Sequence, residues 1–425
     1  MEKVSIEGDN QHPLFASFFA GIGGFDLGFE RQGFVNTYLC ENNSFCNDVL
    51  TLHWPDVSRA GDINAIDSDS IPDVPVWCGG FPCQDVSVAR GSLDRPGLKG
   101  SRSGLFFSFA KLIAAKQPEV VLIENVGGLF NSNKGHDFRV VLSTLNDLGY
   151  GVAWRLLNSR YFGVPQSRPR VYLCCWKGNP AKALEVMFEK DLPRKPGAER
   201  TAFITESTPA GEYPRVPTIG YCLAATSGRH TGTDWSRTYV TCSDGVRRLT
   251  PIECERLQGF PDNWTKTDGD SEDADSHRYA AIGNAVSVPV IEWIAGRIAY
   301  VLNDAEVTPI ETSITEHEPF TGHSWQPLPT GEGDIENKIV WGKSGLMWQG
   351  RFILAEHRDC PCDPKTTTLY DIVEKQRVKD RYYLTPNAAE GILRRVDSNG
   401  RRLFQPLRDA LEDLSGRGKQ EGRVQ

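Results

Sequence analysis

The first 180 residues alternate short apolar runs with segments of helical periodicity, and most of the runs end at a glycine or an acidic residue. The first run, residues 14–19, leads into Ala-Gly-Ile-Gly-Gly at residues 20–24 and then into a helical pattern around Phe25 and Phe29. Repeated strand, turn and helix units predict an open α/β sheet. Ligands bind such sheets at the carboxyl ends of the strands, so a functional site is expected at that edge.

Three of the strand ends carry groups suited to a nucleoside. The glycine turn at residues 20–24 lets a ligand lie against bare backbone, although it is not the full dinucleotide fingerprint. The run at residues 35–40 ends at Glu41, about 20 residues after the turn, where a carboxylate can bind both ribose hydroxyls. A third unit ends at Asp62. Together they predict a pocket for an adenosine-bearing cofactor without a long phosphate chain.

A cysteine follows the next strand end. Residues 74–78 are apolar and lead through two glycines, a phenylalanine and a proline to Cys83. For a single cysteine, a small buried hydrophobic residue is the simplest interpretation. Here, however, a carboxylate reaches another strand end at Glu124, after the apolar residues 120–123. A thiolate beside an acid indicates covalent catalysis with proton transfer.

Two basic segments lie close to these strand ends in the sequence. Residues 85–103 hold four Lys or Arg among glycines, a pattern typical of a solvated loop or of a lid that closes on a polyanion. Arg168 and Arg170 precede another apolar run. They are either surface charges or groups that bind a phosphate or orient Glu124.

Pattern and composition divide the chain into five segments. They are a catalytic and cofactor-binding α/β domain at residues 12–179, a smaller loop-rich domain at 180–246, a return to the α/β domain at 247–302, an acidic linker at 303–337 and a C-terminal accessory unit at 338–425. Between Tyr213 and Arg248 five Arg outnumber two Asp. This local positive charge suits a loop that reads a nucleic-acid groove.

Helix signals are clear after the loop-rich domain. Thr250 is a good N-cap, Pro251 suits the first helical position, Glu253 completes a capping box, and Gly259 is placed to end the helix. These residues predict a short helix whose role is mainly structural.

Whole-chain properties restrict the class of protein. The chain has 425 residues, a net charge of −8 and eleven scattered cysteines, which is typical of reduced thiols in a reducing compartment. No apolar run approaches the roughly 18 residues of a membrane span, and the first residues lack a signal-peptide pattern. We expect a cytoplasmic protein with two or three domains. Cys360 and Cys362 are too closely spaced for the usual zinc pairing, and no metal site is expected.

Taken together, the motifs resemble those of DNA (cytosine-5) methyltransferases of the bacterial or phage type. The likeness covers about residues 14–302, in the order that the family shows. The matching segments are Phe19-Ala20-Gly21-Ile22-Gly23-Gly24, Glu41, Gly61-Asp62-Ile63, Phe81-Pro82-Cys83-Gln84, Glu124-Asn125-Val126, Gln166-Ser167-Arg168-Pro169-Arg170, Arg256-Leu257-Gln258-Gly259-Phe260-Pro261 and Gly283-Asn284.

This resemblance implies a fold and a set of site residues. The fold is the Rossmann-like α/β sheet of S-adenosylmethionine-dependent methyltransferases, with a target-recognition domain at residues 180–246 and an extra C-terminal unit. Residues implied to act on the base are Cys83, Glu124, Arg168 and Arg170. Residues implied to bind S-adenosyl-L-methionine are Phe19, Gly21, Ile22, Gly23, Gly24, Glu41, Asp62, Ile63, Pro82, Leu105, Asn284 and Val286. DNA contacts are implied for Gln84, Ser87 and Arg90, and Arg229 is the candidate for reading a base.

Two positions depart from the family pattern. Asn42 stands where many members have Trp, and Ala285 stands where many have Ser. Adenine stacking and contacts to the cofactor carboxylate are therefore expected to differ in detail, while the reaction is expected to be the same.

The implied reaction is methyl transfer to C5 of a cytosine in double-stranded DNA. Cys83 would add to C6 of a base flipped out of the duplex, and Glu124 would stabilise charge on the ring. A cognate restriction endonuclease is a candidate partner, no membrane is involved, and a monomer is expected. The alternatives are a cytosine-5 RNA methyltransferase, a catalytically silent DNA-binding regulator and a nicotinamide-dependent oxidoreductase; the last lacks its third fingerprint glycine.

Overall fold

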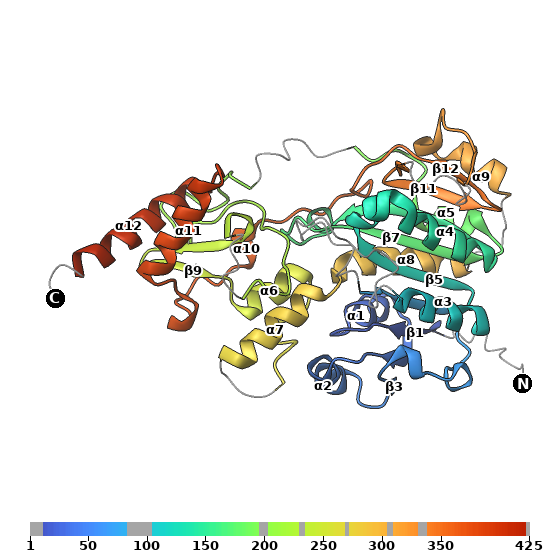
Figure 1. Ribbon diagram of the computed structural model, residues 1–425, viewed down its shortest axis with the longest axis horizontal. Coiled ribbons are helices and arrows are strands. Elements are labelled where there is room, and N and C mark those ends of the chain that lie inside the picture. The colour runs from blue at the N-terminus through green and yellow to red at the C-terminus, as the bar shows by residue number, and fades with distance from the viewer. Residues whose placement is uncertain are drawn as a thin grey trace, which may run out of the picture.

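One large sheet runs through the main body of the protein (Figure 1). The computed structural model describes residues 12–82, 104–194, 203–228, 234–267, 272–303, 309–329 and 338–421. Within these ranges ten strands form a single sheet in the order β10-β12-β11-β6-β7-β5-β4-β1-β2-β3, and β8 and β9 form a separate hairpin.

The N-terminal half of the sheet is parallel. Its strands are β1 (Leu14–Phe18), β2 (Val35–Cys40), β3 (Ser58–Ala60), β4 (Val76–Gly79) and β5 (Val120–Val126). Every neighbouring pair among these five is parallel. Then β6 (Tyr150–Asn158) and β7 (Pro169–Lys177) form an antiparallel pair, with β7 also antiparallel to β5. The predicted α/β sheet is confirmed.

Helices cover both faces of this sheet, because successive strand residues point to opposite sides. In β1, Ala16 and Phe18 pack into the apolar core under α3 (Leu105–Lys116) and α4 (His136–Asp147). Phe15 lies in the opposite core, with α1 (Gly24–Glu30), α5 (Pro180–Met187) and α8 (Val288–Asn303). The sheet therefore has a complete apolar core on each face.

A third apolar cluster joins a helix of the N-terminal α/β units to two helices that follow the loop-rich segment. It is built around α2 (Ser44–His53), α6 (Pro251–Gln258) and α7 (Glu272–Asn284). The helix predicted after Thr250 is confirmed, with the capping box formed and Gly259 left-handed at its end.

The chain stays on the sheet beyond residue 180, which corrects the expected domain boundary. Helix α5 packs against β6, β7 and α8. In the segment expected to be a linker, α9 (Ile310–Glu316) packs on α5, and β10 (Gln326–Pro327) pairs with β12. The acidic composition of the segment gave no indication of this packing and strand pairing.

The predicted C-terminal unit is also divided between two places. Strands β11 (Ser344–Trp348) and β12 (Arg351–Leu354) extend the main sheet, with β11 antiparallel to β6. They cover the backbone hydrogen-bonding groups that β6 would otherwise expose at a sheet edge. Residues 344–354 are thus part of the α/β body.

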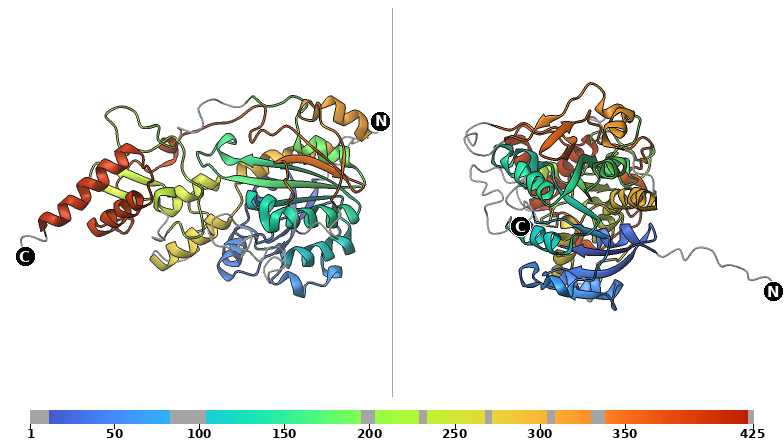
Figure 2. Two further views of the ribbon diagram at one scale, coloured as in Figure 1. Left: turned by 45° about the horizontal axis from the view of Figure 1, so that its top comes forward. Right: turned by 90° about the vertical axis from the view of Figure 1, so that its right-hand side faces the viewer.

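The C-terminal helices and the separate hairpin build a second lobe, seen at the left of Figure 1 and in the left view of Figure 2. Its elements are β8 (Tyr239–Cys242), β9 (Gly245–Arg248), α10 (Leu369–Ile372), α11 (Pro386–Ser398) and α12 (Gln405–Glu421). Tyr239 and Val246 of the hairpin share one apolar core with Ile392, Val396 and Leu411 of the two long helices.

A buried ion pair fixes this lobe to the start of α6. Arg247 donates to both carboxylate oxygens of Glu253, at 2.8 and 2.7 Å, and neither side chain is exposed. Glu253 also accepts from the backbone of Thr250 and of Glu374. One carboxylate therefore connects the hairpin, a helix start and the C-terminal segment.

One stretch among the described residues, Asp273–Asn303, is apolar and long enough to cross a membrane. More than half of its most apolar window is buried in the fold, and core helices of soluble proteins pass the same test.

Asp26 in α1 gives the sheet a pH-dependent stability. It is fully buried, and it accepts hydrogen bonds from Asn36 Nδ2 at 2.8 Å and Ser17 Oγ at 3.2 Å. Burial raises the pKa of this carboxyl from 3.8 to about 7, against the opposing effect of its hydrogen bonds. The folded state thus binds the proton more tightly than the unfolded chain, so stability falls as the pH rises from 3.8 to about 7.

We predict that Asp26→Asn removes this fall, because the amide keeps the shape without the charge. The parent should lose on the order of 4 kcal/mol of unfolding free energy across the interval. Denaturant unfolding at pH 4 to 8 measures the loss, and the exposed Asp56→Asn is the control. Parallel pH profiles for Asp26→Asn and the parent would contradict the assignment.

Candidate active site

Four predicted site segments meet at one edge of the sheet because their strands are in register. Phe18 pairs with both Cys40 and Gly79, and Gly79 pairs with Ile123. In parallel strands the residues that follow also lie side by side. The strand ends that lead to Phe19, Glu41, Gly80 and Glu124 are therefore neighbours.

Glu41 and the glycine turn are in direct contact, as expected for one pocket. Glu41 Oε2 accepts a hydrogen bond from the backbone N–H of Gly21 at 2.8 Å, and Oε1 accepts from that of Asn43 at 2.8 Å. Gly21 has a φ of 58°, and open space lies where a Cβ would stand. Bare backbone and a carboxylate thus face the same open space.

The neighbouring glycines serve packing. A Cβ on Gly23 would lie 2.3 Å from the Trp54 ring, and one on Gly24 would lie 2.7 Å from Val286 Cγ2. Ile22 and Val286 are buried, so their side chains support the turn from behind.

The other predicted cofactor residues surround this edge at varying depth. Asp62 accepts from the backbone of Asn64 at 2.9 Å, and the Phe19 ring meets Phe109 edge-on at 5.9 Å. Ile63 is buried, Pro82 and Leu105 are half-buried, and Asn284 is exposed at the end of α7.

Glu124 forms an ion pair with Arg170 and is largely shielded from water. Its Oε1 lies 3.1 Å from Arg170 Nε, and each side chain is only about 13 to 14% exposed. Burial raises the pKa of Glu124, and the positive charges of Arg170 and Arg168 offset this only in part. A Cβ on Gly80 would lie 3.3 Å from Glu124 Oε2. The backbone therefore passes directly beside the carboxyl, three residues before Cys83.

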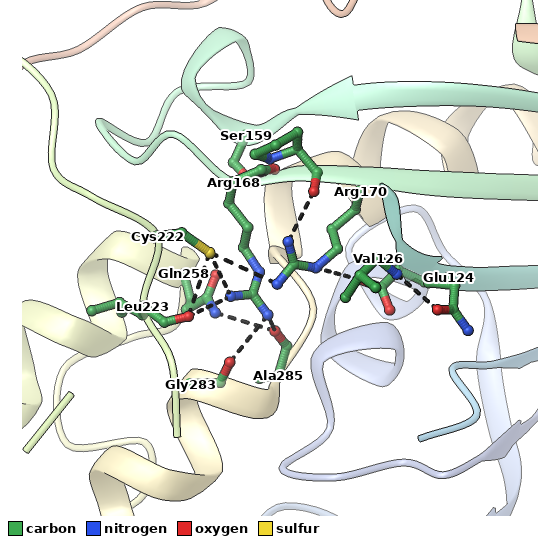
Figure 3. A network of polar contacts seen from close by, with 12 residues as sticks. Glu124, Val126, Ser159, Arg168, Arg170, Cys222, Leu223, Gln258, Gly283 and Ala285 are labelled. Carbon is green, nitrogen blue, oxygen red and sulfur yellow. Dashed lines mark hydrogen bonds and ion pairs between the residues drawn. The ribbon is translucent and has the colours of Figure 1, made fainter. Parts of the chain in front are cut away.

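Arg168 has a different role from the one expected. Its guanidinium donates to the carbonyls of Leu223 at 2.9 Å, Gly283 at 3.1 Å and Ala285 at 2.7 Å (Figure 3). The side chain is 2% exposed, and it forms no direct ion pair with Glu124 among the described residues. Arg168 is thus a positioning residue that joins three chain segments, and it is not free to contact a base.

Cys222 also lies in this site, although no sequence pattern predicted it there. Its sulfur lies 3.5 Å from Arg168 Nη1 and 3.8 Å from Arg170 Nη2 (Figure 3). Although surrounding protein atoms oppose ionisation, the two arginines lower the pKa of the Cys222 thiol. Only the folded chain brings residue 222 to residues 168 and 170, so no local pattern could have predicted it.

Five predicted site residues lie outside the described part of the chain. They are Cys83, Gln84, Ser87, Arg90 and Arg229. Their assignments stay predictions.

The arginines of the loop-rich segment are largely used inside the protein. Arg247 pairs with Glu253, and Arg215 pairs with Glu206 at 2.7 Å. Arg237 donates to the Thr226 carbonyl, and Arg248 donates to that of Gly228. Two of these four arginines thus have acidic partners within the protein, and the other two donate to backbone carbonyls.

The fold is the Rossmann-like fold of S-adenosylmethionine-dependent methyltransferases. The Entamoeba histolytica methyltransferase EhMeth aligns with a TM-score of 0.51 and 17% identity, covering 69% of this chain and 100% of that one. The S. pombe Dnmt2 methyltransferase also has a TM-score of 0.51, with 18% identity and the same coverage. These structures support the fold.

Sequence relatives define the family. The family model for C-5 cytosine-specific DNA methylase matches residues 14–210 and 205–300. Type II methyltransferase M.NgoBI of Neisseria gonorrhoeae is 35% identical, covering 64% of this chain and 89% of its own length. Type II methyltransferase M.HhaI of Haemophilus parahaemolyticus is 30% identical, covering 68% and 95%. The chain therefore belongs to the C-5 cytosine-specific DNA methylase family and is a DNA (cytosine-5) methyltransferase.

We predict that Arg168→Met lowers the unfolding free energy by about 3 kcal/mol or more. Each buried carbonyl left unsatisfied costs about 1 to 3 kcal/mol. The carbonyls of Leu223 and Gly283 would lose their arginine donor, whereas that of Ala285 still accepts from Gln258 Nε2 at 3.1 Å. Arg170→Met is the matched control and should cost less, because Glu124 can take up a proton. Denaturant unfolding measures both variants. Equal losses of unfolding free energy in the two variants would contradict the assignment of a structural role to Arg168 rather than to Arg170.

We also predict that Cys222 is alkylated at lower pH than Cys362. Both residues are exposed, but burial and the nearby Glu189 raise the pKa of Cys362 to about 11, whereas the two arginines lower that of Cys222. Since the thiolate is the reactive form, iodoacetamide labelling followed by peptide mass spectrometry across pH 6 to 10 should separate them. Coincident labelling profiles would rule the arginine effect out.

Proposed function

We propose that this enzyme transfers a methyl group from S-adenosyl-L-methionine to C5 of a cytosine flipped out of duplex DNA, through a covalent bond between Cys83 and C6. The observation that supports it most is the surroundings of Glu124. A buried carboxyl with a raised pKa, paired with Arg170, adjoins the backbone that leads to Cys83. The same edge of the sheet holds Glu41 and the glycine turn.

The residues of that turn fit the cofactor. Glu41 and Asp62 offer carboxylates to hydroxyl and amine groups, and no atom lies within 4 Å of the place where a Gly21 Cβ would stand. The Phe19 ring adds an apolar surface. When bound there, S-adenosyl-L-methionine would supply an electrophilic methyl group held by a positively charged sulfur.

The protein's own groups would activate the base. Cytosine C5 is a poor nucleophile, so addition of the Cys83 thiolate at C6 is needed to raise the electron density at C5. Glu124, whose pKa is raised by burial, would share a proton with ring N3 and stabilise the charge that develops. Arg170 would hold the carboxyl in place. Loss of the C5 proton then expels Cys83.

The base must leave the helix, because C6 is inaccessible in a stacked duplex. Flipping costs a few kcal/mol, which phosphate and groove contacts offset. We assign the recognition of the target sequence to the part of residues 180–246 that follows α5, with Arg229 reading a base and Gln84, Ser87 and Arg90 contacting DNA. Its relatives are Type II methyltransferases, which supports a role in restriction and modification beside a cognate endonuclease. We propose a cytoplasmic monomer.

We predict that the parent forms a covalent adduct with duplex DNA containing 5-fluorocytosine and that Cys83→Ala does not. Fluorine at C5 cannot leave as a proton would, so the thiol stays bound to C6. Denaturing gel electrophoresis resolves the adduct, and Cys362→Ala is the control because it removes another exposed thiol. An adduct in Cys83→Ala, or none in the parent, would refute the covalent role.

A further inference from the structure

The two C-terminal helices are part of the lobe that carries the loop-rich segment. Ile392 and Val396 of α11 and Leu411 of α12 are buried against the β8–β9 hairpin. Helix α12 packs on both strands, and α11 packs on the short helical turn Asp234–Ser236. The outer surface of this lobe is therefore formed in part by α11 and the residues that follow it.

Residues 375–402, which include α11, are strongly basic. Residues 375–402 hold eight Lys or Arg and three Asp or Glu, an excess of five positive charges in a protein of net charge −8. Part of the excess is used internally: Arg377 pairs with Asp244 and Asp380, and Arg381 pairs with Asp275.

Three arginines remain available. Arg394, Arg401 and Arg402 are exposed, and none of them forms an ion pair with a described residue. Arg394 lies in the last turns of α11, and the other two follow Gly400 at its end. Exposed guanidinium groups without acidic partners are suited to phosphate oxygens.

The position of the cluster connects it to the segment proposed to read DNA. Arg401 lies over the ring of Trp235, 5.9 Å from its centroid. Trp235 is separated from residues 229–233 by Asp234 alone. Arg401 of the tail thus adjoins the segment whose Arg215 and Arg247 are paired with carboxylates.

We infer that Arg394, Arg401 and Arg402 form a phosphate-binding surface for the backbone of duplex DNA. This inference rests on the proposed function, since it gives the same DNA substrate a second area of contact. Phosphate contacts carry no sequence information, so the surface contributes affinity and leaves the choice of target unchanged.

The test is DNA binding by the full-length protein in which all three arginines are changed to alanine. At about 0.15 M salt, the Kd for a duplex containing the target sequence should rise by roughly 10-fold or more. The slope of log Kd against log salt should fall by up to about 3, because each lost phosphate contact removes about 0.9. Turnover at saturating DNA should stay at the parental value.

A charge-matched control removes three positive charges elsewhere. Lys177, Lys343 and Arg351 are exposed on the main body, and Arg351 lies over Trp325 much as Arg401 lies over Trp235. Their alanine variant should change the salt slope little. A third variant, with lysine at positions 394, 401 and 402, should keep most of the affinity and guards against a folding defect.

The outcomes separate the two proposals. A parent that neither binds nor methylates DNA overturns the proposed function, and the surface with it. A parent that methylates DNA while the alanine and control variants show the same Kd and salt slope overturns the surface alone. A smaller slope in the alanine variant only, with unchanged sequence choice, supports it.

Discussion

The guanidinium of Arg168 is the interaction on which the geometry of the site depends. It donates to the carbonyls of Leu223, Gly283 and Ala285, so it joins the chain just before β7 to the loop that holds Leu223 and to the end of α7. A buried guanidinium without partners would be strongly destabilising, so all three segments are held together. Arg170, two residues along, projects toward the same region and meets Glu124.

The chemistry of the site follows from this clamp and from the strand register. Because β1, β2, β4 and β5 end side by side, the carboxylate of Glu41 meets the glycine turn on one side, and Glu124 meets the chain toward Cys83 on the other. Burial favours the protonated form of Glu124, while Arg170 limits that effect. The fold thus brings a buried carboxyl and the glycine turn to one edge of the sheet.

Local patterns were sufficient to predict the α/β units, the glycine turn and the capped helix at Thr250, because each is determined by nearby residues. The pairing of β11 with β6 joins Gly345 to Trp154, far apart in the chain, and no local signal marks it. The acidic stretch before it looked like a linker although α9 packs there. Arg168 was expected at the base, but its partners are carbonyls that only the folded chain assembles, as is its contact with Cys222.

The most direct test of the account is single-base sequencing of cytosine methylation in the DNA of cells that express this protein. We expect 5-methylcytosine at one recurring short sequence, present with the parent protein and strongly reduced with Glu124→Gln, whose amide cannot supply the carboxyl proton. Cells with an empty vector provide the background. Methylation at background level with the intact, folded protein would contradict the account, and full methylation with Glu124→Gln would show that the carboxyl has another role.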